Sequence, residues 1–366
     1  TTQHLQNFYL TKRDARTVTE WLNDCGIDAA AYYSGITDDN FDNSAEYREF
    51  LEDALYNNEI KALVATTALA MGYDKPDLNF VIHFQAPDSI ISYYQQVGRA
   101  GRAIDNAYGI LLSGKEDAEV HNYFRESAFP PEEIVQNILQ TLEGYDGLSI
   151  PKIQEVLNIK YGQITQTLKY LSVEEPSPII YERPKWKRSA ISFTMDTEKI
   201  ERLTNQRLLE WNLVQDYINT EECLMTFLQR ELDDPNITNC GKCANCLGES
   251  ILPNSVTHEN IVEASVYLKH SEFDILPRKQ IASNALPEYG WRGNLRADLQ
   301  AETGKVLSRW GDAGWGKMVV DDKHYGFFRD ELVVAMSEMI VDRWKPDPFP
   351  EWLTCPGQTL LKIRQI

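Results

Sequence analysis

The sequence has 366 residues, more than a single hydrophobic core usually supports, so we expect two or three domains. The net charge of −19 disfavours a surface coated with phosphate contacts, because nonspecific affinity for nucleic acid comes mainly from Lys and Arg, yet it permits one local basic groove. No apolar run approaches the roughly 20 residues that span a bilayer and no secretory signal is visible, so we expect a cytoplasmic protein without a membrane segment.

Residues 1–128 alternate short apolar runs with amphipathic stretches. We expect strands at 8–10, 29–33, 61–65, 80–84 and 109–112, and helices at 12–24 and 46–56. Thr11 is the expected N-cap of the first helix, and Gly26 is expected to end it. Strands that take turns with helices predict a parallel sheet covered on both faces, so this part is assigned to the α/β class.

Residues 129–196 differ in pattern from the preceding part. Three short helical patterns at 133–142, 150–157 and 163–171 precede two expected strands at 179–181 and 190–193, which together indicate a winged helix. The expected hairpin tip is the densest basic run in the chain and is a candidate DNA-binding surface. A solvated basic turn is the alternative, although an aromatic among four cations favours nucleic acid. The run comprises Arg183, Lys185, Trp186, Lys187 and Arg188.

Residues 197–250 join a long amphipathic helix to a group of four cysteines. Cys223 is followed after sixteen residues by Cys240. Cys243 and Cys246 come next, with two residues between successive cysteines. Zinc prefers four soft ligands at tetrahedral corners, and a Cys-x-x-Cys turn places two sulfurs on one ion. The spacing therefore predicts a structural zinc site. Four cysteine ligands leave no open coordination position, which argues against metalloenzyme chemistry here.

A zinc deaminase is a poor alternative. That class combines a His-x-Glu with a following Pro-Cys-x-x-Cys. In this sequence His270 and Glu272 come after the cysteines, and Asn239 rather than proline precedes Cys240.

Two further segments carry polar residues that are suited to binding phosphate oxygens. Thr66 and Thr67 follow the third expected strand, and hydroxyls at the carboxyl end of a strand suit a phosphate oxygen in the crevice of an α/β sheet. Arg99 and Arg102 lie among glycines, and their planar cations suit phosphoryl oxygens. An arginine that reaches a γ-phosphate from a neighbouring lobe stabilises the charge of the transition state. An exposed basic helix end explains the two arginines alone, but not the whole string.

Together these strings resemble those of the superfamily 2 helicases, and of the RecQ family in particular. The segment 95–102 is similar to helicase motif VI, 66–76 to motif V, and 8–14 with 32–35 to the motif IV region. The cysteine spacing is similar to that of the RecQ zinc subdomain. The resemblance covers about residues 1–250.

The resemblance implies an ATP-driven 3′-to-5′ DNA helicase with two RecA-like lobes that close on ATP and Mg²⁺. It implies that Arg102 is the arginine finger, Arg99 a second γ-phosphate contact and Gln95 an organiser of the cleft between the lobes. Many RecQ proteins have Asn where this chain has Asp74. The resemblance implies two further sets of contacts, with ATP at Gly72 and Asp74, and with the DNA backbone at Ser34, Thr66 and Thr67.

The same resemblance divides the chain into four parts. Residues 1–128 are interpreted as the second RecA-like lobe, 129–196 as a winged-helix-like domain, 197–250 as a helical zinc-binding subdomain and 251–366 as an α+β accessory region. Typical RecQ proteins place their winged helix after the zinc cysteines. The order here is similar to a RecQ-like subgroup that continues into a phosphoribosyltransferase-like domain, but no phosphoribosyl-pyrophosphate loop is present and we expect no transferase activity.

A complete motor also needs a phosphate loop of the form Gly-x-x-x-x-Gly-Lys-Ser/Thr. The run from Gly109 to Lys115 comes close, but Glu116 replaces the hydroxyl that binds magnesium, and the run is expected to be a buried strand. No Asp-Glu-x-His box is present either. We therefore expect the first lobe to lie upstream of Thr1 and the chain alone not to hydrolyse ATP. The alternative function is a non-enzymatic module that binds nucleic acid or a partner protein, and an RNA substrate is a weaker option.

Overall fold

The structure is a computed structural model that divides into two compact units, residues 1–252 and 253–366. It describes residues 5–9, 11–69, 73–253, 255–270, 272–277, 279–286, 288, 291–308, 312, 314–346, 352–353 and 361–362. None of the helices in these ranges is both long and apolar enough to span a bilayer. The finer division of the first unit, at residues 128 and 196, stays a prediction.

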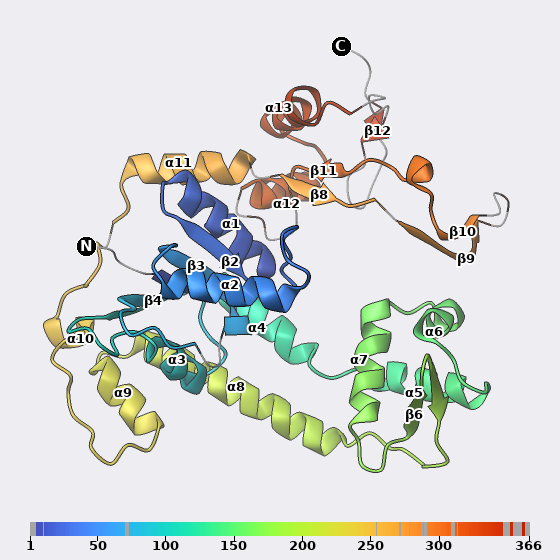
Figure 1. Cartoon of the computed structure of the whole chain (residues 1–366), viewed down its shortest axis with the longest axis horizontal. Helices are drawn as coiled ribbons and strands as arrows, with labels where there is room; N and C mark the ends of the chain where they lie inside the picture. Colours follow the sequence, from blue (N-terminus) through green and yellow to red (C-terminus); the bar gives the residue numbers. More distant parts are fainter. Residues whose placement is uncertain are drawn as a thin grey trace. The chain divides into compact units, whose positions relative to one another are not determined.

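A five-stranded, all-parallel sheet forms the start of the first unit (Figure 1). The strand order is β2-β3-β1-β4-β5, and every residue of β3 is buried. This sheet confirms the α/β class, because buried parallel strands are covered by helices on both faces. The strands are β1 Leu5–Tyr9, β2 Ala29–Tyr32, β3 Ala62–Thr66, β4 Phe80–His83 and β5 Tyr108–Leu111.

The helices between the strands are α1 Lys12–Asp24, α2 Ser44–Tyr56 and α3 Ile90–Val97, and the short helix η1 Thr67–Leu69 follows β3. As predicted, the Thr11 side chain caps α1 by accepting a hydrogen bond from the Asp14 amide at 3.2 Å. In the cores, α1 packs on Val64, whereas α2 packs on Leu63 and Ala65. Because successive strand residues point to opposite faces, α1 and α2 cover opposite sides of the sheet.

Residues 129–196 form three helices and a hairpin around a core of their own. After α4 Glu116–Glu126 come α5 Glu132–Glu143, α6 Ile150–Leu157, α7 Tyr161–Ser172, β6 Ile179–Glu182 and β7 Lys185–Arg188. The core residues Ile138, Ile153 and Ile164 are wholly buried.

The expected second strand of this hairpin, at 190–193, was wrong. The strand is β7, so most of the basic run is strand, and only Arg183 and Pro184 form the turn. Trp186 explains the difference, because its backbone exchanges two hydrogen bonds with Leu148 while its ring lies 4.6 Å from that of Tyr181 on β6. β7 therefore pairs with β6 on one side and with Leu148 on the other, which fixes its position between them.

The long helix α8 Thr197–Asn219 leads to α9 Leu224–Glu231 and to α10 Ala244–Leu247 (Figure 1). Apolar residues of α8 and α9 share one core with α3 of the sheet domain, and these include Ile90, Tyr93, Trp211, Val214 and Phe227. The cysteine-bearing segment is therefore packed on the sheet domain.

The second unit combines helices with short antiparallel strand pairs, β8 with β11 and β9 with β10. Its helices pack around Leu307, Trp315 and Met339. Helix α13 continues directly into a wider π-helical segment, η4. The elements are α11 His258–His270, β8 Phe273–Ile275, β9 Gln280–Leu286, β10 Trp291–Asn294, η3 Ala297–Leu299, β11 Gly304–Val306, α12 Gly316–Tyr325, α13 Asp330–Glu338, η4 Met339–Trp344, β12 Trp352–Leu353 and β13 Leu361–Lys362.

Candidate functional site

Two loops, residues 73–79 and 98–107, lead into the parallel strands β4 and β5 and lie together at the amino ends of those strands. The Gly101 amide donates to the Leu78 carbonyl at 3.0 Å, and the Ala103 amide donates to the Pro76 carbonyl at 2.9 Å. Gly101 has a φ of +81°, and a Cβ there would lie 2.9 Å from the Cβ of Ala107. Glycine is therefore required at the point where the loops meet.

This junction brings together three residues that the sequence singled out. Arg102 pairs with Asp74 at 2.8 Å, and both side chains are about half exposed, at 46% and 60%. Arg99 is buried and donates to the Tyr73 carbonyl at 2.7 Å. Burial and the nearby Arg102 lower the pKa of Arg99, and Asp74 opposes that shift. One arginine is thus fixed beneath the surface, and the other presents its cation to solvent.

The other two residues predicted near the nucleotide are less informative. Gly72 lies outside the described residues. Gln95 lies on the exposed side of α3, whereas its neighbour Gln96 is buried and shares a 2.6 Å hydrogen bond with His83. The sequence had not singled out Gln96 or His83. The helical period gives a partial signal, because Tyr93 and Gln96 are one turn apart and face inward together.

The residues predicted to contact DNA lie at the opposite edge of the sheet. Ser34 follows β2, while Thr66 ends β3 and Thr67 comes next, so all three lie at carboxyl ends of strands. Ser34 and Thr67 are exposed, and Thr66 is nearly buried with its hydroxyl accepting from the Ala68 amide at 3.4 Å. The sheet thus separates this set from the arginine pair.

A hollow of about 540 Å³ lies beside Ser34, between α1 and the loop that follows β2. Its lining includes Arg16, Tyr33, Gly35 and Thr37. Lys12 donates to the Ser34 carbonyl near this hollow and lies 5.6 Å from the centre of the Tyr33 ring. Arg16 and Glu20 both line this hollow, so its lining carries charges of both signs, and Lys12 lies beside it.

The basic hairpin carries less free charge than its sequence suggests. Lys187 pairs with Asp146 at 3.1 Å and with Glu182 at 2.9 Å, and these contacts raise the pKa of Lys187. Arg188 donates to the Pro178 carbonyl at 2.6 Å, and Trp186 packs on the domain core. Only Arg183 and Lys185 are exposed members of the run, and neither forms an ion pair with the part of the chain that the structure describes.

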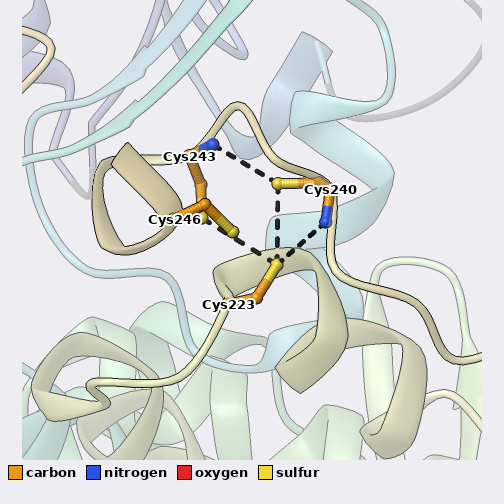
Figure 2. Close-up of side chains that lie close together, drawn as sticks. All are labelled: Cys223, Cys240, Cys243 and Cys246. Atoms are coloured by element: carbon orange, nitrogen blue, oxygen red, sulfur yellow. Dashed lines mark hydrogen bonds between the residues drawn. The ribbon is translucent and has the colours of Figure 1, made fainter. Parts of the chain in front are cut away.

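The four predicted metal ligands are brought together (Figure 2). Cys223 lies at the start of α9, Cys240 and Cys243 precede α10, and Cys246 lies on α10. Their sulfur atoms all lie within 4.8 Å of one another, with 3.5 Å between those of Cys223 and Cys240. Backbone amides point at the sulfurs, from Cys240 to Cys223 at 3.2 Å and from Cys243 to Cys240 at 3.3 Å.

Such donors favour thiolates, which are the form that binds metal. Burial acts to raise the pKa of Cys223, but hydrogen bonds from the Cys240 and Thr226 backbone, together with those from the Thr226 and Cys246 side chains, outweigh it and lower this pKa to about 6. The residues present therefore fit a metal ion held by four sulfurs. Asn245 supports the arrangement by donating to the carbonyls of Thr220 and Glu222 at 2.8 and 2.7 Å.

Comparison with known proteins shows which helicases the chain resembles and over which residues. Residues 6–104 match the helicase conserved C-terminal domain. The ATP-dependent DNA helicase RecQ of Synechocystis is 26% identical over 263 residues, which cover 67% of this chain and 50% of that protein. Over these residues the chain is similar to RecQ-type superfamily 2 helicases.

Two further RecQ-type relatives show how far the similarity extends. RecQ of Bacillus subtilis is 22% identical over 348 residues, which are 90% of this chain and 46% of that protein. The ATP-dependent DNA helicase Q1 of Pongo abelii is 38% identical over 110 residues, or 30% of this chain and 16% of that protein. The chain therefore spans half or less of the length of these relatives.

The structure also explains why the near-match to a phosphate loop in this chain does not form one. The Gly114 amide donates to the Asp117 carboxylate at 3.2 Å, and the same carboxylate accepts from the Ala86 amide at 3.0 Å. The buried Asp117 carboxylate therefore already accepts the backbone amide of Gly114 in this run. The strand expected in this run is present as β5, but Gly109 is exposed, so the expectation of burial there was wrong.

We predict that His83 makes the stability of the folded chain pH-dependent. Burial lowers the pKa of His83 from 6.5 to about 4, although the hydrogen bond with Gln96 opposes that shift. The unfolded chain therefore binds this proton more tightly, and stability falls as the pH falls from about 6.5 to about 4. The loss due to His83 is about 3 kcal/mol. Denaturant unfolding at several pH values should show a shallower dependence for His83→Asn, and equal slopes for the two proteins would contradict the prediction.

Proposed function

We propose that this chain is the C-terminal portion of an ATP-dependent 3′-to-5′ DNA helicase and that Arg102 is its arginine finger. The main support is the arrangement of Arg102, exposed beside a single carboxylate on a loop whose backbone is fixed at Gly101 and Ala103. A guanidinium that is fixed in place but open to solvent can exchange Asp74 for a phosphate oxygen.

The chemistry requires a first RecA-like lobe, supplied by the same polypeptide, that carries the phosphate loop. Magnesium on that lobe would neutralise charge on the phosphates. From this chain, Arg102 would reach the γ-phosphate and stabilise the charge that develops during transfer. Arg99 would support it from beneath, because its hydrogen bond to the Tyr73 carbonyl holds the neighbouring loop.

DNA would occupy the opposite edge of the sheet. Ser34 and Thr67 are exposed there, and Lys12 and Arg16 add positive charge beside the hollow. Contacts of this kind bind phosphates without reading sequence. The rigid sheet between the two edges would let closure on ATP move the DNA-contacting edge as one body.

We predict that Arg102→Ala abolishes most ATP hydrolysis in the protein that combines this chain with its first lobe. Loss of an arginine finger lowers kcat by about 10³-fold or more. Arg125→Ala, which removes a partly exposed arginine from α4, serves as the matched control and should leave turnover unchanged. The measurement is DNA-stimulated phosphate release. DNA-stimulated turnover by the present chain alone, abolished by Arg102→Ala, would contradict the proposed division of labour.

We also propose that the four cysteines hold a structural zinc ion. Four thiolates close the coordination sphere, so this ion would stabilise α9 and the adjoining core instead of taking part in hydrolysis. Phe227 connects the cysteine cluster to this core. It follows Cys223 by one helical turn and packs on Tyr217 of α8, with ring centres 5.4 Å apart.

We predict that the purified chain contains stoichiometric zinc and that Cys243→Ser loses it. Removing a ligand opens the site and leaves thiolates without their cation, so the melting temperature should fall as well. Cys25→Ser is the matched control, because Cys25 is exposed and outside the cluster. Elemental analysis and thermal melting measure the two effects. Equal zinc content in the Cys243→Ser variant and the parent chain would remove these residues as the site.

The competing proposal is a module that binds nucleic acid without hydrolysing ATP, and the exposed residues Arg183 and Lys185 favour a DNA contact in either case. The two proposals separate when the chain is fused to a RecQ-type first lobe. Only the helicase proposal expects the fusion to recover ATP hydrolysis.

We predict that the combined change Arg183→Ala and Lys185→Ala weakens duplex DNA binding and flattens its salt dependence. Loss of two phosphate contacts lowers the slope of log affinity against log salt by about 1.8. The combined change Lys152→Ala and Lys199→Ala removes equal charge from residues paired with Glu155 and Glu174, and is the matched control. Fluorescence anisotropy across a salt series measures the slope, and an unchanged slope would end the role assigned to this turn.

A further inference from the structure

Lys75 is a buried lysine beside the arginine site, within the segment that resembles motif V, and the proposed chemistry gives it no role. Its side chain has no exposed surface. The ammonium group donates to the Tyr56 carbonyl at 3.1 Å and to Asn58 Oδ1 at 2.6 Å, and it pairs with Asp77 at 2.7 Å. All three protons of the ammonium therefore have an acceptor.

Two of the three acceptors come from the end of α2, and the third, Asp77, lies in the same loop as Lys75. Tyr56 is the last residue of that helix, so its carbonyl is one of those that lack a partner within the helix. A cation at this end is also favoured by the helix dipole. Asn58 follows with a φ of +64°, and this left-handed conformation presents its side chain to Lys75. Lys75 thus attaches the loop 73–79 to a helix that packs on the sheet core.

The residues on either side of Lys75 hold the two arginines. Tyr73 accepts from Arg99, and Asp74 pairs with Arg102. On the other side, the Pro76 and Leu78 carbonyls accept the backbone of the turn that carries Arg102. The attachment at α2 therefore lies in the middle of the loop from which both arginines are positioned.

We propose that Lys75 is a positioning residue for the arginine finger. It fixes the loop 73–79 against α2, and the loop in turn sets the place of Arg99 and Arg102. Packing alone does not require a lysine, because methionine of similar length would fill the space without burying a charge. The inference rests on the proposed ATPase function, since positioning matters only if Arg102 acts on the nucleotide.

A double-mutant cycle tests this role in the protein that combines this chain with its first lobe. The proteins are Lys75→Met, Arg102→Ala and the double variant, and the measurement is kcat and KM for ATP at saturating DNA. Misplacement of a catalytic group by about 1 Å costs up to about 100-fold, so Lys75→Met should lower kcat by about 10- to 100-fold with little change in KM. In the Arg102→Ala background the same change should lower kcat by less than about twofold.

A second variant covers the case in which Lys75→Met does not fold. Asn58→Gly removes one acceptor of Lys75 while glycine keeps the positive φ, so the backbone is preserved. It should lower kcat several-fold with an unchanged melting temperature. Lys61→Met is the matched control, because Lys61 is exposed beside the same sheet and should leave kcat unchanged.

The outcomes separate the two proposals. If Arg102→Ala leaves turnover intact, the proposed function fails. If Arg102→Ala abolishes turnover but Asn58→Gly and any folded Lys75→Met keep the parent kcat, the role of Lys75 alone is overturned. The role of Lys75 is also overturned if the fold-decrease in kcat of the double variant equals the product of the two single decreases, since Lys75 would then act independently of Arg102.

Discussion

Two backbone hydrogen bonds, from Gly101 to Leu78 and from Ala103 to Pro76, join the loops that enter β4 and β5. The arginine site depends on this junction. It places Arg102 beside Asp74, although the two are far enough apart in the chain that no local structure relates them. The close approach requires glycine at residue 101, and the buried ammonium of Lys75 attaches the junction to α2. Electrostatic catalysis needs an exposed cation on a rigid backbone. The cation is then already in position, and little free energy is spent on reorganising it when the transition state forms.

The cysteine cluster is connected to the same region through side-chain packing. Tyr93 on α3 lies 5.2 Å from Tyr217 on α8, ring centre to ring centre, and Tyr217 packs on Phe227 next to the cluster. These aromatic side chains are nearly inaccessible to solvent. The segment that carries the cysteines and the sheet domain therefore stabilise each other, and α3 is the element that they share.

Charge is distributed so that an acidic chain keeps local cationic sites. Asp and Glu total 55 against 36 for Lys and Arg. In the hairpin, acidic neighbours neutralise Lys187, so the densest basic run of the sequence presents fewer free cations than its composition indicates. At the carboxyl edge of the sheet, Lys12 and Arg16 lie together with exposed polar groups. Limited patches of this kind suit the proposed helicase function, because affinity for nucleic acid rises steeply with each phosphate contact and a helicase must release DNA at each step.

Local chemistry along the chain was sufficient for much of this picture. The alternation of strands and helices predicted the parallel sheet, and Thr11 predicted the start of the first helix. The spacing of the cysteines predicted that they form one cluster. These predictions succeeded because each depends on residues close in sequence. The position of β7 was missed, since the Trp186 backbone pairs with Leu148, which lies outside the hairpin. Likewise, the buried partners of Lys75 and the contact between Gln96 and His83 join segments distant in sequence. Periodicity and motif spacing carry no information about such partners, because long-range packing selects them only when the chain folds.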